Sequence, residues 1–404
     1  MALGSKAVRA SFKALAHLAS HGTPPDRETA KKISVGLEGS LEKFNSEVIP
    51  YLSIGGTEIQ FVYGANGRGK THYLLSLEES ARNQGFVTAR IDCSIGGTPF
   101  QSLDATYRMI ANALRPPPSM DVDQSVGVTS IIRSAFGDEA ELPAEQVLRK
   151  LKIAKHLCPE VRNLALSYGQ GCMSGQLTDH LADQIEYLLL GAQGRLITIS
   201  SLYKLDRSLP RPLGKLTSRN SANWLRSLLS LPHALGYPGL ILLFDETERV
   251  MHSLSPSARQ AQLAHIRNIV DYCALGAFNG CLILYAAADD FVDSARRDLD
   301  ALAQRIEPPS LLIGNWPSSM RSVWTDLDDL TEPSTQDPTF FELLSDRIVG
   351  LGIDAGLSTA RAGDLKRTLK GSAIRFANSP TSSVVREFVK KAASAVLMEV
   401  PRRG

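Results

Sequence analysis

Eight consecutive residues carry the most specific chemical signal in the sequence. Residues 64–71 read Gly-Ala-Asn-Gly-Arg-Gly-Lys-Thr and match the pattern G-x-x-x-x-G-K-[ST] at every fixed position. The glycines of such a loop let backbone N–H groups face phosphate oxygens, and the helix that follows adds the positive end of its dipole. We therefore expect an ATP site whose loop residues are Gly64, Ala65, Asn66, Gly67, Arg68, Gly69, Lys70, Thr71 and His72.

Within this loop two side chains have distinct predicted roles. Lys70 is expected to reach the β and γ phosphates, and Thr71 to offer its hydroxyl to Mg²⁺. A glycine-rich turn that matches by accident is the alternative. The position of the loop between a strand-like run (58–63) and a helical run (72–83) favours the phosphate site.

A second signal lies far downstream, where an apolar run ends in two carboxylates. Residues 239–244 have the unbroken apolar character of a buried parallel strand, and Asp245 and Glu246 follow directly. Adjacent carboxylates there are costly without a cation or a proton to handle. Asp245 is expected to hold Mg²⁺ and Glu246 to act as the base toward the attacking water. The pattern alone also fits an ordinary strand end, but together with the loop it predicts a Mg²⁺-dependent ATPase.

Strand-like and helix-like segments alternate around these two motifs. The predicted strands are 58–63, 86–92, 239–244, 281–287 and 310–313. Such alternation indicates an α/β fold with a parallel sheet. Because the Asp-Glu strand is not the strand before the loop, we expect the additional-strand (ASCE) division of P-loop NTPases, with a five-stranded parallel core.

The alternation is interrupted once and then ends, which suggests how the chain is divided. Helical periodicity between the two motifs predicts a large helical insertion, and the pattern after residue 339 predicts a helical lid, for which a winged helix is one form it could take. The predicted units are an N-terminal helical segment (1–45), an ATPase core (46–120 and 236–320), the insertion (121–235) and the lid (321–404).

Composition narrows the class of protein. The 404 residues with 43% hydrophobic content are enough for two or three packed cores, and no apolar run approaches the roughly 18 residues that span a bilayer. The five cysteines are scattered without a C-x-x-C pair, which predicts neither a zinc site nor a disulfide framework. We expect a cytoplasmic protein with no membrane association.

Charge is nearly balanced overall but not locally. The formal net charge is +2, which argues against a histone-like grip on nucleic acid. In residues 361–404, however, lysines and arginines outnumber acidic residues, as on a solvated helix surface or a surface for a polyanion. The first 25 residues are basic and helical in pattern. They fit an organelle-targeting peptide, but the pattern favours a first helix of the folded body.

Two arginines are singled out by their place in this layout. Arg305 ends the helix before the predicted fifth strand, where oligomeric ATPases present an arginine to the nucleotide of a neighbouring subunit. Arg386, in the last predicted helix, could contact the γ phosphate from the lid. An ordinary surface arginine is the alternative for each.

Several islands of the sequence resemble one family. They are Gly22-Thr23-Pro24-Pro25, residues 33–38, residues 61–72, Gly236-Tyr237-Pro238-Gly239, residues 243–248 and Arg386-Glu387-Phe388-Val389. In these islands the chain resembles BrxD-type ATP-binding proteins of bacterial BREX phage-defence systems, which are similar to the origin-recognition branch of AAA+ ATPases. The likeness runs nearly from end to end but is strong only in these islands.

The resemblance implies a function beyond the motifs. It implies an AAA+-type ATPase that uses ATP to load or remodel a DNA-bound partner such as a helicase, with double-stranded DNA and a homo-oligomer as further expectations. It also implies that Val35 lies against adenine and that Arg386 is the lid arginine. One departure is that Ala288 stands where a polar sensor is expected at the end of the fourth strand, with Asp289 as a candidate substitute.

Two other function classes stay open. A signal-transducing switch ATPase of the STAND type would hydrolyse ATP slowly to time an on-state. Its usual G-x-P element after the core and its C-terminal repeat array are not seen in this sequence. A nucleotide-gated scaffold that does not hydrolyse ATP is favoured by the alanine at position 288. Glu246 and Arg305 favour the working ATPase.

Overall fold

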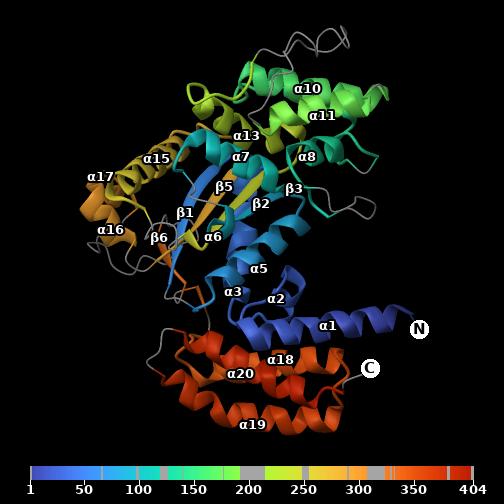
Figure 1. Ribbon diagram of the computed structural model, residues 1–404, viewed down its shortest axis with the longest axis vertical. Helices are drawn as coiled ribbons and strands as arrows, with labels where there is room; N and C mark the ends of the chain where they lie inside the picture. Colours follow the sequence, from blue (N-terminus) through green and yellow to red (C-terminus); the bar gives the residue numbers. More distant parts are fainter. Residues whose placement is uncertain are drawn as a thin grey trace.

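A mixed sheet lies in the middle of an elongated molecule, with helices on both of its faces and at both ends (Figure 1). The computed structural model describes residues 2–64, 67–96, 100–118, 126–138, 140–175, 177–191, 214–247, 254–288, 291–306, 324–327, 330–331, 333–379 and 383–401.

The sheet has the order β3-β2-β4-β5-β1-β6. Its strands are β1 (Thr57–Tyr63), β2 (Val87–Asp92), β3 (Leu114–Arg115), β4 (Leu240–Asp245), β5 (Cys281–Ala287) and β6 (Trp324–Asp326). All neighbouring strands run parallel except β2 and β3, which are antiparallel. The sheet thus holds five parallel strands and one short antiparallel edge strand.

This topology confirms the predicted fold class. β5 lies between the strand before the glycine-rich loop, β1, and the Asp-Glu strand, β4, as in the additional-strand division. The predicted strand 310–313 lies outside the described residues, and the fifth parallel strand that the structure describes is β6. The short edge strand β3, which begins at Leu114, is not among the predicted strands.

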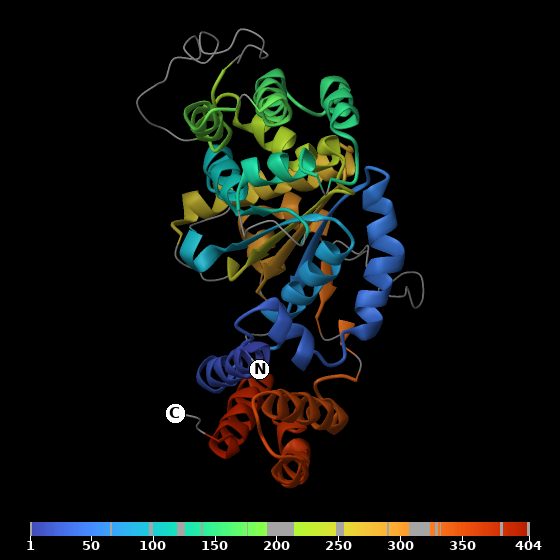
Figure 2. The same cartoon turned by 90° about the vertical axis from the view of Figure 1, so that its right-hand side faces the viewer.

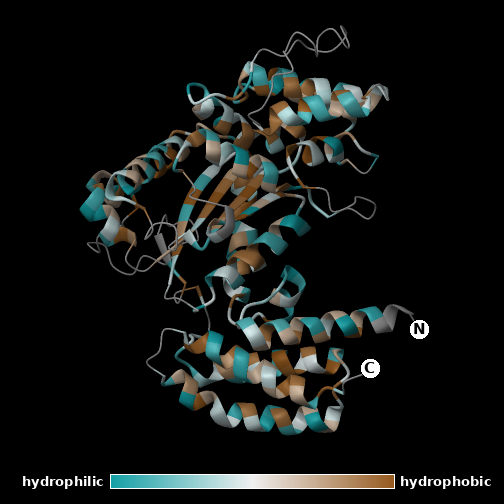
Figure 3. Cartoon of the chain, viewed as in Figure 1, coloured by the Kyte–Doolittle hydropathy of each residue, from teal (hydrophilic) through white to brown (hydrophobic). Residues whose placement is uncertain are grey.

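Burial on both faces explains why the central strands are apolar throughout. Every residue of β4 and β5 is buried, and both strands are strongly hydrophobic in the middle of Figure 3. In a parallel sheet covered on both sides, alternation of polar and apolar residues is not expected. Side chains of the two faces accordingly belong to two separate hydrophobic clusters.

One face of the sheet is covered by the helix that follows the glycine-rich loop. This layer consists of α3 (Glu38–Lys43), the π-helical turn η1 (Phe44–Val48), α4 (Ile49–Ser53) and α5 (Lys70–Asn83). The other face is covered by α7 (Leu103–Ala113), α13 (Ser221–Leu235), α15 (Pro256–Ala274), α16 (Phe291–Asp298) and α17 (Asp300–Ile306). A short helix, α6 (Cys93–Gly96), follows β2. Helices therefore cover both faces of the sheet.

Between β3 and α13 the chain forms further helices at one end of the molecule. They are α8 (Val128–Ala135), α9 (Ala144–Ile153), α10 (Pro159–Ser174) and α11 (Asp179–Leu189). Their apolar residues, such as Val161 and Leu164, join the cluster under α7 and α13. This helical segment is thus continuous with the core of the sheet domain.

At the opposite end, the first helix joins the last three. α18 (Pro338–Asp354), α19 (Thr359–Ala377) and α20 (Val384–Glu399) pack together, and α1 (Ala2–His21) lies against α18 and α20 (Figures 1 and 2). Leu15 and Leu18 of α1 are fully buried in this third cluster. The basic N-terminal stretch is therefore a helix of the folded body.

These C-terminal helices are the only regular elements that the structure describes between residues 333 and 401. A winged helix requires a β-hairpin, and the described residues of this range contain no strand. The C-terminal region is accordingly helical in its described residues, and its role as a lid stays a prediction. α2 (Arg27–Ile33) connects α1 to the layer that contains α5.

Two predictions from composition can be compared directly. The five cysteines are free thiols in the structure. Among the described residues, no helix combines the length and the apolar character that a membrane span requires.

Candidate nucleotide-binding site

The glycine-rich loop leaves β1 and enters α5, as its pattern predicted. Gly67 and Gly69 have φ values of 84° and 113°, a region that side chains with a Cβ rarely adopt, so the turn requires glycine at these points. The Lys70 Nζ donates a hydrogen bond of 2.6 Å to the Gly64 carbonyl oxygen. Lys70 is thereby held over the loop. Ala65 and Asn66 lie outside the described residues.

The two oxygen groups expected to hold Mg²⁺ are in direct contact. The Thr71 hydroxyl donates to Asp245 Oδ1 over 3.2 Å, and the Glu246 backbone N–H donates to the same oxygen over 3.0 Å. Hydroxyl and carboxylate oxygens are ligands that Mg²⁺ prefers. The end of β4 is thus tied to the first turn of α5.

Glu246 has an unusual backbone conformation. Its φ is 56°, and among the described residues that are not glycine only Phe100 shares a positive φ. Such a conformation costs on the order of 1–3 kcal/mol and is typical of functional positions. The Thr247 hydroxyl donates to the Ala286 carbonyl oxygen on β5, which anchors the chain directly after the strained residue.

Burial controls the protonation of Asp245. Desolvation raises the pKa of its carboxyl group to about 6, and the nearby Glu246 carboxylate adds to this rise. The Thr71 hydrogen bond and the positive charge of Arg90 act in the opposite direction. The Arg90 Nη1 lies 3.9 Å from Asp245 Oδ2. An ionised Asp245 would therefore gain considerably from a bound cation.

These groups open into a cleft between the sheet domain and the C-terminal helices. Gly67, Arg68, Gly69, Lys70, Thr71, His72, Asp245 and Glu246 line it on the core side. Its opposite wall is mostly apolar and comes from the turn and helix after α1 and from the C-terminal helices. The apolar lining residues are Pro24, Ile33, Val35, Leu37, Leu327, Phe340, Leu344, Val385 and Val389.

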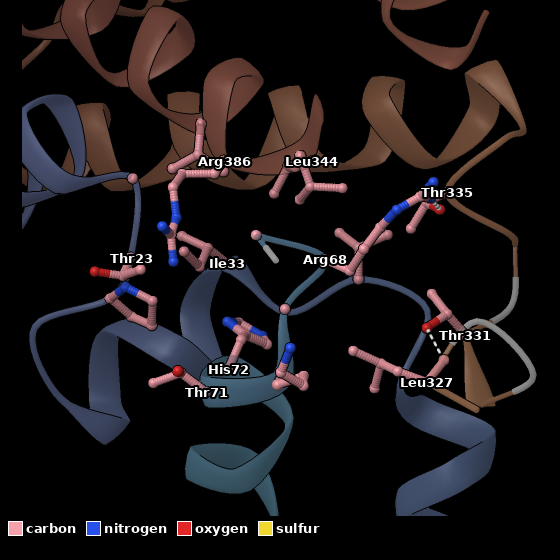
Figure 4. A pocket seen from close by; sticks show the side chains of 18 of the residues that line it. Thr23, Ile33, Arg68, Thr71, His72, Leu327, Thr331, Thr335, Leu344 and Arg386 are labelled. Atoms are coloured by element: carbon pink, nitrogen blue, oxygen red, sulfur yellow. Dashed lines mark hydrogen bonds between the residues drawn. The ribbon is translucent and has the colours of Figure 1, made fainter. Parts of the chain in front are cut away.

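Arg386 reaches into this cleft from α20. In Figure 4 its guanidinium group points from the C-terminal helices toward Thr23 and the start of α5. The Arg386 Nε is buried and has no hydrogen-bond partner in the described part of the chain. A buried guanidinium nitrogen without a partner is costly, so an anion beside it would be stabilised.

Two further residues of the loop region also face the cleft. The Arg68 guanidinium donates to the Thr335 hydroxyl, which connects the loop to the segment before α18 (Figure 4). Desolvation lowers the pKa of His72 to about 4, so its imidazole is neutral at pH 7. Positive charge near the phosphate position therefore comes from lysine and arginine and not from His72.

Of the remaining predicted residues, Arg305 is not brought to this cleft. Arg305 is on α17, and its Nε donates to Asp271 Oδ1 of α15 over 2.5 Å. It does not line the cleft of its own chain, so a role toward a neighbouring subunit's nucleotide stays a prediction. Asp289, the candidate sensor, lies outside the described residues.

Sequence reasoning missed much of the cleft wall. Thr331, Thr335, Phe340, Leu344 and Val385 line the cleft but belong to none of the motifs or family-like islands. The only signal is spacing, since Phe340 and Leu344, and likewise Val385 and Val389, lie four residues apart on one helix face. That spacing predicts a buried face but not what it covers.

The residues present fit ATP with Mg²⁺. Lys70, the loop amides and the unpartnered Arg386 Nε suit phosphates, and Thr71 with Asp245 suits Mg²⁺. Val35, which is almost fully buried, lies on the apolar wall that suits a purine. The role of each residue remains a prediction.

Comparison with known proteins gives one match. The family model described as BREX system ATP-binding protein BrxC/D matches residues 9–124 and 213–335. The matched parts include the glycine-rich loop and the Asp-Glu strand, while α8–α11 fall in the unmatched stretch. No curated protein and no solved structure shows a match.

Proposed function

The chain belongs to the family of BREX system ATP-binding proteins BrxC/D, and we propose that it binds ATP with Mg²⁺ in the cleft and hydrolyses it. In this proposal, hydrolysis serves to load or remodel a DNA-bound partner, such as a helicase, in phage defence.

The strained Glu246 is the single observation that best supports hydrolysis. Its carboxylate follows the residue suited to Mg²⁺, and its backbone is held in the left-handed region at φ 56°. A fold that holds such strain at one carboxylate that lines the cleft is consistent with a catalytic base. In a purely structural turn, glycine or asparagine would adopt this backbone conformation with less strain than glutamate does.

The chain's own residues have separable tasks in this proposal. Lys70 and Arg386 bind phosphate oxygens from opposite walls of the cleft, and the apolar wall excludes water from the base. Mg²⁺ held by Thr71 and Asp245 would neutralise phosphate charge. Glu246 accepts a proton from the attacking water.

Ala288 favours a second candidate function. This residue follows β5, where a polar sensor would help to position the water. Without it, a nucleotide-gated scaffold or a slow switch would bind ATP in the same cleft and hydrolyse it little.

ATP turnover, measured with and without duplex DNA, distinguishes these candidates. We expect Lys70→Ala to weaken ATP binding by about 100-fold or more, because charge-assisted bonds to the phosphates are lost. Glu246→Gln should still bind ATP but lose turnover by about 100-fold to 10,000-fold. Glu79→Gln, a change of the same chemical type at a half-buried position of α5 that does not line the cleft, serves as the control.

Each outcome has a separate meaning. Unchanged ATP affinity in a folded Lys70→Ala protein would contradict the nucleotide site itself. Equal turnover in the parent protein and Glu246→Gln would leave the scaffold as the better description.

A further inference from the structure

Arg90 lies almost midway between two buried carboxylates. Its Nε is 3.8 Å from Glu78 Oε2 on α5, and its Nη1 is 3.9 Å from Asp245 Oδ2 on β4. One guanidinium thus serves both the carboxylate suited to Mg²⁺ and a carboxylate with no part in the nucleotide motifs. The relative attraction of Arg90 to Glu78 and to Asp245 decides how strongly Arg90 competes with a cation for Asp245.

Glu78 is held firmly in its place. Its side chain is only 4% exposed, and its Oε1 accepts bonds from Arg27 Nη1 at 3.0 Å and from the Thr88 hydroxyl at 3.2 Å. A buried carboxylate persists only when partners of this kind compensate its desolvation. Glu78 therefore presents a fixed negative charge to Arg90.

The placement of Glu78 follows from helix periodicity. Thr71 and Glu78 are seven residues apart on α5, which is close to two turns, so both face the sheet. Thr71 contacts Asp245 directly, while Glu78 reaches the same carboxylate only through Arg90. The helix α5 thereby influences Asp245 in two ways, directly through Thr71 and indirectly through Glu78 and Arg90.

We propose that Glu78 is a positioning residue that restrains Arg90 and so leaves Asp245 available to a divalent cation. Arg27, at the start of α2, in turn holds Glu78 and ties it to the N-terminal segment whose Ile33 and Val35 line the cleft. The inference rests on the proposed nucleotide function. It assigns a purpose to a buried charge that no motif explains.

Divalent-cation binding measures this restraint without any need for turnover. The parent protein and its variants are loaded with a non-hydrolysable ATP analogue, and Mn²⁺, as a stand-in for Mg²⁺, is titrated and followed by electron paramagnetic resonance. In Glu78→Gln the guanidinium of Arg90 is drawn to Asp245 alone. The Mn²⁺ concentration for half-saturation should rise by about 10-fold.

The decisive variant is the double substitution. Arg90→Gln alone removes the competing cation, so its half-saturating Mn²⁺ concentration should equal that of the parent or fall below it. Glu78→Gln combined with Arg90→Gln should show the same value as Arg90→Gln. A role limited to stabilising the fold would instead make the double variant at least as weak as Glu78→Gln.

Glu79→Gln is the matched control, since Glu79 is 4.0 Å from Arg27 and more exposed than Glu78. A rise in half-saturating Mn²⁺ for Arg90→Gln would overturn the proposal, and that measurement stands even if Glu78→Gln fails to fold. No shift in folded Glu78→Gln would overturn it as well. A parent protein that binds no ATP analogue would instead contradict the nucleotide function on which the inference rests.

Discussion

Asp245 is a single residue at which function and stability conflict. Binding of Mg²⁺ requires its ionised carboxylate, whereas burial favours the neutral form. Burial raises the pKa of this carboxyl group in the folded protein to about 6, above its ordinary value of 3.8. The folded state therefore binds this proton more tightly than the unfolded chain does. The resulting stabilisation is complete below about pH 4 and is lost as the pH rises through about 6.

Asp245→Asn should remove this conflict. At pH 8 the variant without ligand is expected to exceed the parent in free energy of unfolding by about 2 kcal/mol, because a neutral amide avoids the desolvation of the charge. The difference should vanish toward pH 4. Denaturant unfolding at several pH values measures it.

Asp183→Asn is the control for this comparison, since Asp183 is exposed on α11. It should show little difference from the parent at any pH. Lower stability of Asp245→Asn at pH 8 would show that the native contacts of the carboxylate outweigh its desolvation.

The turn between α1 and α2 sets, at the scale of elements, how closely the N-terminal segment approaches α20. Gly22 has a φ of 71°, and a Cβ at this position would lie 2.6 Å from Arg386 Cγ and 2.7 Å from the Arg386 carbonyl oxygen. Backbone contact of this kind cannot be relieved by rotating a flexible side chain. The turn therefore determines the position of Arg386 in the cleft.

Gly22→Ala should lower the free energy of unfolding by about 2 kcal/mol and weaken ATP binding, because both the backbone strain and the contact with Arg386 are unfavourable. Gly356→Ala separates the two effects. Gly356 has a φ of 104° but open space around its Cβ position, so its variant should lose stability and retain ATP affinity. Thermal unfolding and titration with a fluorescent ATP analogue test both, and equal ATP affinities in the two variants would contradict this view of Gly22.

The helices and strands also differ in whether the sequence could predict them. The glycine-rich loop and the strand before Asp245 are encoded locally, and so the pattern alone predicted β1, α5 and β4. The two-residue strand β3 was missed because its pairing with β2 is a tertiary contact. The apolar cleft wall was missed for a similar reason, since helical spacing at Phe340 and Leu344 reports burial but not the ligand or element that is covered.

The predicted role of Arg305 depends on the assembly of several chains, because its predicted partner is the nucleotide of another subunit. Its ion pair with Asp271 joins two side chains that are each more than a third exposed, so breaking it costs only about 0–1 kcal/mol. Exchanging Asp271 for a phosphate group bound to a neighbouring subunit would therefore cost little free energy. Its place on α17, away from the cleft of its own chain, is compatible with this exchange.

We expect Arg305→Ala to bind ATP normally but to hydrolyse it about 1,000-fold more slowly. Mixing Arg305→Ala with Glu246→Gln should restore part of the activity, because one interface then combines an intact base with an intact arginine. Arg297→Ala, an exposed arginine on α16, is the control and should behave as the parent. No recovery on mixing, with a monomeric protein in ATP, would exclude a shared site.

Charge on the C-terminal helices suggests where duplex DNA would bind. Several of the basic residues there are engaged in ion pairs with carboxylates, namely Arg361, Lys366, Arg367 and Lys370. Arg375 and Lys391 are exposed, and in the described part of the chain neither is paired with a carboxylate. Lys391 lies 5.1 Å over the Phe376 ring, which places its charge beside the end of α19.

Arg375→Glu combined with Lys391→Glu should therefore weaken binding to duplex DNA without changing ATP affinity, because neither residue lines the cleft. Contacts to phosphates carry little sequence preference and release counterions, so the affinity of the parent for duplex DNA should fall as the salt concentration rises. Loss of two such contacts should reduce the slope of log affinity against log salt concentration by about 1.8. Lys152→Glu with Lys155→Glu, which changes the net charge equally on the exposed surface at and just beyond the end of α9, should leave that slope unchanged. Fluorescence anisotropy with labelled duplexes at several salt concentrations measures these slopes. If both double variants lose affinity equally, the attraction comes from overall charge and not from a surface on the C-terminal helices; if the parent with ATP binds no duplex even at low salt, contact with DNA must come from a partner protein.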